Sequence, residues 1–349
     1  MKEKEPIDFS ILKPASSYLS DYASLLRSIR EAENAARTMS AENEKKRTPK
    51  TPPPTTPDVL DPNAPKTEAE KSPETPNLDE LLAELDELVG LEQIKENVRS
   101  LINLVKVRKL REEYGLAVPK MSLHLVFMGN PGTGKTTVAR LIAKLYCAIG
   151  VLSKGQLVEV DRSGLVAGFV GQTAIKTNEV IQSALGGVLF IDEAYALSPK
   201  NGDANDFGHE AIETILKAME DHRNDLVVIV AGYDDLMDDF ISSNPGLESR
   251  FNRYFMFPDY NEEELAAIFQ SMCRKNQYIT TPEAEEAVNK HLKMLYETRD
   301  ENFGNARDVR NFLENVMTVH SNRVAAMEAP TKEDLMNILP EDVEKATEM

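Results

Sequence analysis

A glycine-rich segment between a predicted strand and a predicted helix constrains this chain more than any other feature. The segment reads Gly129, Asn130, Pro131, Gly132, Thr133, Gly134, Lys135, Thr136 and Thr137, and it fits the pattern G-x-x-x-x-G-K-[ST]. The apolar stretch 123–128 before it predicts a strand, and the amphipathic stretch 138–146 after it predicts a helix. Glycines at such a turn let backbone N–H groups point at a triphosphate, and the start of the helix adds a favourable dipole. The segment therefore predicts a phosphate-binding loop, in which Lys135 reaches the outer phosphates and Thr136 holds Mg²⁺.

Two carboxylates follow a second apolar stretch. Residues 188–191 read as a strand, and Asp192 and Glu193 come directly after it. In a parallel sheet this strand would end beside the phosphate-binding loop. Asp192 would then coordinate Mg²⁺ through water, and Glu193 would polarise the water that attacks the γ-phosphorus. The sequence thus predicts ATP and Mg²⁺ as cofactors and ATP hydrolysis as the reaction.

Strands and helices alternate through the middle of the chain. The predicted strands are 123–128, 157–160, 188–192, 226–231 and 254–257, and helical patterns separate them. This alternation predicts an α/β fold, with a parallel sheet covered by helices on both faces and a ligand at the carboxyl ends of the strands. After Pro258 only helices are expected, at roughly 261–275, 283–298, 304–327 and 331–338.

The first part of the chain differs in composition from the rest. Residues 17–40 show helical spacing of apolar residues, and we expect a helix that either docks on the main body or recruits a partner. Residues 48–76 contain nine prolines among 29 residues, which predicts an extended, solvated tether. The predicted domains are an N-terminal helical segment (1–47), a disordered linker (48–77), an α/β ATPase domain (78–259) and a small helical lid domain (260–349).

Composition argues against several classes of protein. The formal net charge is −18, which disfavours a sequence-independent binder of nucleic-acid backbones. Two cysteines far apart argue against a disulfide framework or a cysteine metal site. The sequence has neither an apolar run long enough for a membrane helix nor an N-terminal apolar stretch typical of a signal peptide, so a cytoplasmic protein is expected.

Five separated motifs together resemble the AAA+ ATPases. They are the glycine-rich segment, Gly186 to Tyr195, Ala231 to Tyr233, Asn244 to Phe251, and Phe257 to Tyr260. More narrowly, they are similar to the CbxX/CfqX family, the group that contains stage V sporulation protein K and red-type rubisco activase. The resemblance covers about residues 79–340. It implies a hexameric ring in which ATP lies between neighbouring subunits.

The resemblance also assigns roles to residues outside the two motifs above. An arginine from the neighbouring subunit would stabilise the transition state, and its position implies Arg250, with Arg253 as second choice. The alternative for Arg250 is an arginine that caps local carbonyls. Arg307 matches the element that reaches the γ-phosphate from the lid. Val89 and Gly90 match a turn beside adenine. Arg310, one turn after Arg307, is expected to form a structural ion pair.

Two further positions concern water and client handling. Many AAA+ proteins end the fourth strand with a polar residue that orients water, and here Tyr233 or Asp234 could take that role. Phe169 lies between two glycines and matches the aromatic pore-loop position by which similar machines grip peptides. The alternative for Phe169 is a side chain buried in the core.

These observations predict an ATP-hydrolysing ring motor that remodels a protein client by pulling a segment into its pore. A nucleotide-dependent scaffold that recruits a partner through the N-terminal helix is an alternative, and a rubisco activase is another. DNA remodelling would require tight, salt-dependent binding to duplex DNA, which the acidic composition disfavours. No feature of the sequence selects the client.

Overall fold

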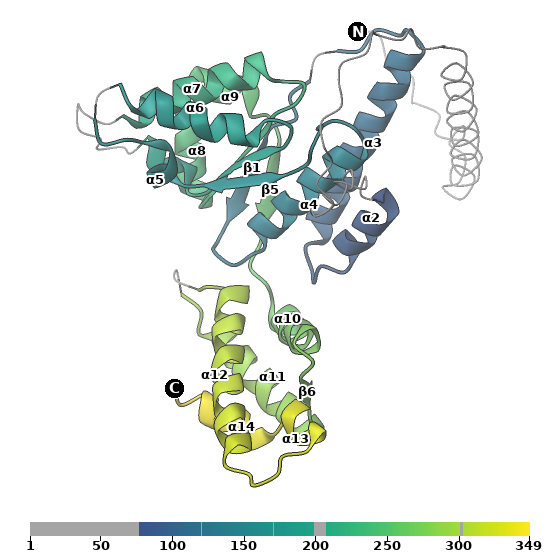
Figure 1. The fold of residues 1–349 in the computed structure, drawn as a ribbon, viewed down its shortest axis with the longest axis vertical. Coiled ribbons are helices and arrows are strands. Elements are labelled where there is room, and N and C mark those ends of the chain that lie inside the picture. Colours follow the sequence, from purple (N-terminus) through teal and green to yellow (C-terminus); the bar gives the residue numbers. More distant parts are fainter. Residues whose placement is uncertain (1–76, 120, 170, 199–206, 301–302) are drawn as a thin grey trace, which may run out of the picture. The chain divides into compact units, whose positions relative to one another are not determined.

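The computed structural model describes residues 77–119, 121–169, 171–198, 207–300 and 303–349 (Figure 1). The predicted N-terminal helical segment and all but the last residue of the predicted linker lie outside the described residues. Five strands form the main sheet: β1 (Leu125–Gly129), β2 (Leu157–Val160), β3 (Val188–Ile191), β4 (Val227–Gly232) and β5 (Tyr254–Phe257). In the main sheet the predicted strands are confirmed, with ends that shift by two residues at most.

The helices before the end of β5 are α2 (Leu78–Asp86), α3 (Glu92–Glu113), α4 (Lys135–Ala148), α5 (Arg162–Leu165), α6 (Thr173–Ala184), α7 (Gly208–Asp221), α8 (Asp234–Ser242) and α9 (Pro245–Arg250), with a 3₁₀ turn η2 (Ala194–Leu197) after β3. Those after β5 are α10 (Glu262–Lys275), α11 (Pro282–Glu297), α12 (Ala306–Ala325), α13 (Lys332–Met336) and α14 (Pro340–Ala346). No helix in the described ranges is both long and apolar enough to cross a bilayer.

The main sheet is parallel throughout, in the order β2-β3-β4-β1-β5. Because β1 lies between β4 and β5, its carboxyl end has a strand on either side. Parallel strands place their carboxyl ends at one edge, where ligands of open α/β sheets bind. The loops that follow β1, β3 and β4 therefore meet at that edge.

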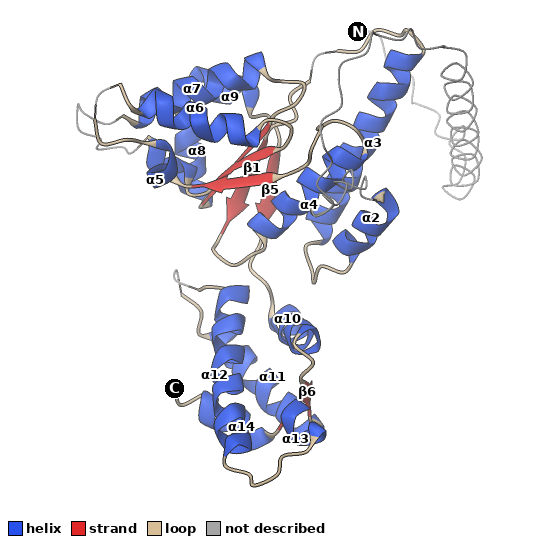
Figure 2. Ribbon diagram, in the orientation of Figure 1, coloured by secondary structure: helices blue, strands red, loops and turns tan. Residues whose placement is uncertain are grey.

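Strand residues alternate between two apolar cores. Phe127, Phe190 and Ile229 belong to the core under α2, α3 and α4, whereas Met128 and Ile191 belong to the core under α6 to α9. Figure 2 shows these two groups of helices on opposite faces of the sheet. A sheet buried on both faces gives nearly continuous apolar strands, as found in β1, β3 and β4.

The segment after β5, residues 260–349, is called the lid below. Its helices α10, α11, α12 and α14 pack together, and residues of these helices belong to the same apolar core as α2 to α4. The expectation that strands stop after Pro258 is wrong, because β6 (Ile279–Thr280) pairs in parallel with β7 (Asn337–Ile338). Strands of two residues are too short for the sequence to show the alternation typical of a strand. The helix α14 was not predicted either.

A buried ion pair ties α12 to α14. Asp342 is fully buried and accepts hydrogen bonds from Nε and Nη2 of Arg323, each at 2.8 Å. The carboxylate also accepts from the backbone N–H of Leu339 at 2.9 Å, just before α14 begins. These bonds raise the pKa of Arg323 above its usual range.

Replacing Asp342 with alanine should destabilise the protein by about 3–5 kcal/mol, because the largely buried Arg323 charge loses its closest partner and keeps only the exposed Glu341 carboxylate at 3.8 Å. Urea unfolding followed by circular dichroism measures this change. Lys345→Ala is the matched control on the same helix: its exposed pair with Glu341 spans 3.8 Å and should contribute about 0–1 kcal/mol. Equal effects of the two substitutions would contradict the prediction.

Candidate functional site

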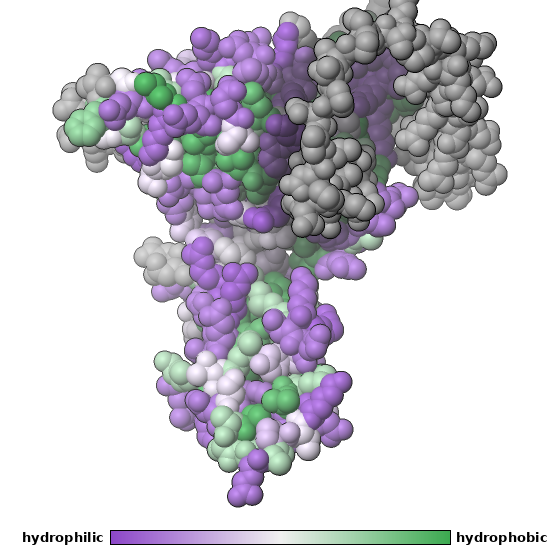
Figure 3. Space-filling view, in the orientation of Figure 1, coloured by the Kyte–Doolittle hydropathy of each residue, from purple (hydrophilic) through white to green (hydrophobic). Residues whose placement is uncertain are grey.

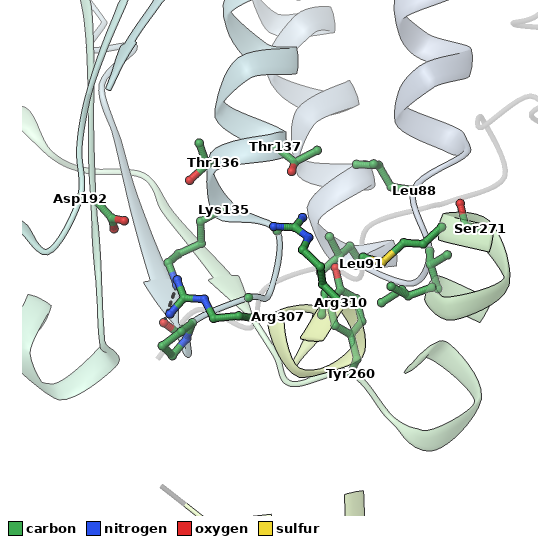
Figure 4. A pocket seen from close by; sticks show the side chains of 18 of the residues that line it. Leu88, Leu91, Lys135, Thr136, Thr137, Asp192, Tyr260, Ser271, Arg307 and Arg310 are labelled. Carbon is green, nitrogen blue, oxygen red and sulfur yellow. Dashed lines mark hydrogen bonds between the residues drawn. The ribbon is translucent and has the colours of Figure 1, made fainter. Parts of the chain in front are cut away.

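A cleft of about 480 Å³ opens at the carboxyl edge of the sheet. Its walls come from the turn before α3, the loop after β1, the ends of β3 and β4, and α10 and α12 of the lid. Figure 4 shows Lys135, Thr136 and Thr137 on one side, with Asp192 from β3 and Arg307 and Arg310 from α12 around the same space. The residues predicted to bind nucleotide and lining the cleft are Val89, Gly129, Pro131, Gly132, Gly134, Lys135, Thr136, Thr137, Asp192, Glu193 and Arg307.

The glycines of the phosphate loop (residues 129–136) adopt positive φ angles, which residues with a side chain rarely adopt. Gly132 has φ 73° and Gly134 has φ 95°, both in the left-handed region. A side chain at Gly132 would also collide with the backbone carbonyl of Gly304 in the lid. Gly134 is the N-cap of α4, so the helix begins at Lys135, three residues before the predicted stretch. The helix N-terminus and the loop N–H groups thus face the space where phosphates could bind.

The ammonium of Lys135 folds over the loop. Its Nζ donates to the carbonyls of Gly129 and Asn130, both at 2.8 Å. Burial lowers the pKa of Lys135 below its ordinary value, and the nearby carboxylates of Asp192 and Asp234 act in the opposite direction. A phosphate placed in the cleft would supply the negative charge that this half-buried cation lacks.

Asp192 and Glu193 occupy the end of β3 as predicted. Glu193 has φ 48°, an uncommon value for a residue with a side chain, and it is exposed. Its N–H donates to Oδ1 of Asp192 at 3.1 Å. Thr136 and Asp192 offer a hydroxyl and a carboxylate to the same cleft, and this hard oxygen set fits Mg²⁺ shared with phosphates and waters.

The opposite end of the cleft is more apolar. Leu88, Val89 and Leu91 approach from the turn before α3, and Ile268 and Met272 approach from α10. Such a wall suits the flat face of a base. Gly90, also predicted here, has φ 60° and abuts Glu264 of α10, so it shapes the turn while its neighbours form the wall.

The lid contributes two cations to the cleft. Arg307 and Arg310 are one turn apart on α12 and both line it. Arg307 lies near enough to Lys135 to help lower the pKa of that ammonium. The expected structural ion pair of Arg310 is not found among the described residues; Arg310 faces the cleft because its spacing from Arg307 places both on one side of the helix.

The end of β4 supplies the remaining wall. Tyr233 lines the cleft, and its ring lies 6.1 Å from that of Tyr195. Asp234 begins α8 close to Lys135, and burial raises the pKa of its carboxyl. Both candidates for the water-orienting position therefore lie close to the phosphate loop, with Tyr233 on the cleft surface.

Three predicted residues lie away from the cleft walls. Arg250 ends α9, where its Nη2 is 3.7 Å from a carboxylate oxygen of Glu220 and its Nη1 donates to the Gly246 carbonyl at 3.4 Å, as the carbonyl-capping alternative expects. Arg253 has Nη2 3.1 Å from the Met121 sulfur. Phe169 lies between α5 and α6 and is 72% exposed, so the alternative of a buried core side chain is wrong. None of the three lines the cleft.

Sequence reasoning missed residues that hold the phosphate loop through hydrogen bonds; of these, Tyr260 also lines the cleft. Asn130 donates through Nδ2 to both carboxylate oxygens of Asp259, at 3.0 and 3.2 Å. Tyr260 donates through its hydroxyl to the Thr133 carbonyl at 3.1 Å, and Asn305 reaches the loop from the start of α12. The signal was present, since Asp259 and Tyr260 lie in a family motif and Asn305 precedes Arg307. Thr133 itself is buried and bonds back to the Asn130 carbonyl.

Comparisons with known proteins agree with this site. Residues 125–259 match the model of the ATPase family associated with various cellular activities (AAA), and residues 261–349 match the AAA lid domain. Stage V sporulation protein K of Bacillus subtilis is 43% identical over 267 residues, covering 76% of this chain and 82% of that protein. The chloroplastic ribulose bisphosphate carboxylase/oxygenase activase of Cyanidioschyzon merolae is 44% identical over 272 residues, covering 77% and 92%.

Two further similarities extend the comparison. Protein CbbX of Cereibacter sphaeroides is 46% identical over 246 residues, covering 70% of this chain and 79% of that protein. The structure of a RuvB mutant of Thermotoga maritima aligns with a TM-score of 0.51 at 19% identity, covering 76% of this chain and 71% of that one, which supports the fold alone.

A parallel α/β domain with a phosphate loop and a helical lid defines a nucleotide-binding ATPase. The chain belongs to the AAA ATPases, in the group that contains stage V sporulation protein K, CbbX and the CfxQ proteins. It therefore binds nucleotide and hydrolyses ATP.

Two substitutions should separate nucleotide binding from hydrolysis. Lys135→Ala should weaken ATP binding by about 30-fold or more, because a charge-assisted contact to phosphate is lost. Glu193→Gln should bind ATP like the parent and hydrolyse it about 10²-fold or more slowly, because only the base is lost. Fluorescent-nucleotide titration and phosphate release measure the two effects. Hydrolysis at the parent rate by Glu193→Gln would exclude the role of Glu193 as base.

Proposed function

We propose that this protein is a ring-forming ATPase motor that remodels a protein client by pulling a segment of it through a central pore. The observation that carries the proposal is the separation of two sets of residues. A set of residues suited to phosphate binding lines one cleft, and Arg250 and Phe169 do not line it. Residues outside the cleft of one subunit are free to act on a neighbouring subunit and on a client.

In the proposed reaction, ATP lies in the cleft with its phosphates on the loop. Thr136 and Asp192 would hold Mg²⁺, which supplies charge neutralisation at the phosphates when bound. Glu193 accepts a proton from the attacking water, and Lys135 and Arg307 stabilise charge on the phosphoryl oxygens. Because Glu193 is exposed, its carboxylate remains accessible to water until a neighbouring subunit covers it.

Arg250 is a better candidate than Arg253 for the arginine that enters the ATP site of the neighbouring subunit. Its side chain is 31% exposed, and the 3.7 Å contact with Glu220 is an exposed pair worth about 0–1 kcal/mol. A phosphate could therefore displace Glu220 at little cost. Arg253 instead turns toward the body of its own subunit, where it opposes the rise that burial imposes on the pKa of Tyr146.

Large exposed apolar side chains support assembly. They occur both before the lid, at Leu104, Val107, Tyr254 and Met256, and within it, at Ile279, Met294 and Leu335. Figure 3 shows one face, on which apolar patches interrupt a largely hydrophilic surface. Patches of this kind mark interaction sites more often than isolated exposed residues do.

The client proposed is a flexible protein segment. Two relatives with nearly equal identity carry names from different processes, sporulation and rubisco activation, so rubisco and a sporulation protein are both clients to test. A nucleotide-dependent scaffold is the second candidate. It predicts that deleting residues 1–76 abolishes function with unchanged ATP hydrolysis, whereas the motor requires Phe169.

Assembly and the role of Arg250 can be tested together. Light scattering after size exclusion should give about six subunits for Glu193→Gln with ATP and Mg²⁺. Arg250→Ala should hydrolyse ATP about 10³-fold or more slowly, since transition-state charge loses its partner. Mixing Arg250→Ala with Lys135→Ala should restore activity, because mixed interfaces pair an intact cleft with an intact Arg250.

Arg253→Ala is the matched control. Before it is mixed with Lys135→Ala, it should hydrolyse ATP at nearly the parent rate. Failure of the Arg250→Ala mixture to gain activity, in rings shown to exchange subunits, would contradict a role in the neighbouring site. A monomer with and without nucleotide would contradict the ring.

Phe169→Ala should abolish client remodelling and leave basal ATP hydrolysis within a few fold, because Phe169 lies outside the cleft and would grip the client. Remodelling is measured as unfolding of a fluorescent reporter fused to a candidate client segment. Phe169→Tyr keeps an aromatic ring and should retain most of the activity. Loss of nucleotide binding in Phe169→Ala would show that the residue acts on the ATP site instead.

A further inference from the structure

We propose that Asp259 and Asn305 are positioning residues for the ATPase site, which together clamp the phosphate loop to the lid. Asp259 lies between β5 and α10, and Asn305 is the N-cap of α12. Neither side chain lines the cleft, so both act through the loop. The proposal concerns nucleotide binding itself and holds whatever the client is.

Asp259 joins two amide side chains from distant parts of the chain. Its Oδ1 accepts from Nδ2 of Asn130 in the loop at 3.0 Å and from Nδ2 of Asn305 at 2.8 Å. Oδ2 accepts a further contact from Asn130 at 3.2 Å. Hydrogen bonds to an ionised acceptor are among the stronger ones in proteins. The carboxylate therefore connects the loop with Asn305, the N-cap of the lid helix that carries Arg307.

Asn305 is fully buried and uses its whole side chain. Its Nδ2 also lies 3.3 Å from the Pro131 carbonyl, and its Oδ1 accepts from the Tyr260 N–H at 2.9 Å. The residue has φ 53°, an uncommon value that asparagine tolerates better than most residues. A buried residue held at such a backbone angle, with every side-chain polar atom bonded, has one well-defined position.

Groups from the lid and its entry hold three successive carbonyls of the loop. The Pro131 carbonyl accepts from Asn305, the Gly132 carbonyl from the N–H of Ala306 at 3.3 Å, and the Thr133 carbonyl from the Tyr260 hydroxyl at 3.1 Å. Burial raises the pKa of Tyr260 above its usual range, so the phenol remains a donor.

Fixing these carbonyls also fixes the N–H groups that bind phosphate. In a trans peptide the carbonyl of one residue and the N–H of the next point in opposite directions. The N–H groups of Gly132, Thr133 and Gly134 are therefore turned away from the lid donors, and within the described residues no hydrogen-bond acceptor for them is found. The clamp thus presents them to a phosphate before it arrives, and it couples the loop to the lid by a route separate from Arg307.

Nucleotide affinity is the direct readout, measured in the full chain with fluorescent N-methylanthraniloyl-ADP and Mg²⁺. Asp259→Asn should weaken binding about tenfold, because two amide donors then face one neutral acceptor. Asn305→Asp should weaken it further, since two carboxylates would lie at hydrogen-bond distance. Adding Asp259→Asn to Asn305→Asp restores a complementary pair and should recover part of the loss.

Three comparisons separate positioning from general destabilisation. Glu263→Gln removes one negative charge from the exposed first turn of α10 and should bind like the parent. Amide hydrogen exchange should rise at Tyr260 and Ala306, whose N–H groups bond to Asn305 Oδ1 and to the Gly132 carbonyl, in Asp259→Asn while α4 and β1 keep their protection. In an Arg307→Ala background, Asp259→Asn should produce the same fold-loss as in the parent, because the routes are separate.

Parent-like affinity in Asp259→Asn, with parent-like exchange at Tyr260 and Ala306, would overturn the proposal. So would an Asp259→Asn substitution that has no further effect once Arg307 is removed. Uniformly faster exchange throughout the sheet and lid would assign Asp259 a purely structural role and overturn it as well.

Discussion

The orientation of a few peptide groups in the phosphate loop is the constraint on which the rest of this structure depends. Backbone N–H groups bind phosphate when they point at it together, and glycine is the residue that most readily adopts the positive φ of this turn. Strand β1 leads into the loop at the carboxyl edge, and α4 starts after Gly134 at the other end of the loop. Asp192 and Glu193 reach the same edge only because β3 is parallel to its neighbours.

Much of this arrangement was predictable, since local sequence determines it. The apolar strands are buried on both faces and stand out as continuous runs, and the loop motif has a fixed spacing. Residues adjacent to a strand end, such as Asp192, follow from the strand assignment alone. The same holds for the helical spacing of α10, α11 and α12.

What escaped prediction depends on contacts between residues far apart in sequence. Nothing local shows that Asp259 bonds to Asn130, because 129 residues separate them and either side chain could be solvated. Arg310 was assigned to an ion pair, and only the orientation of α12 shows that it faces the cleft. The pair β6 and β7 is likewise formed by two short segments that lack periodicity.

The apolar core under α4 continues without interruption into the lid, where Tyr260, Leu265 and Phe269 belong to it. Wide opening of the lid would expose this apolar surface to water, and each Å² exposed would cost about 25 cal/mol of free energy. The packing therefore disfavours large rotations of the lid. The lid would therefore move as a stiff lever over a short range. In the proposed ring, each hydrolysis cycle would then move the client by a small step. Pulling in a long client segment would need many cycles.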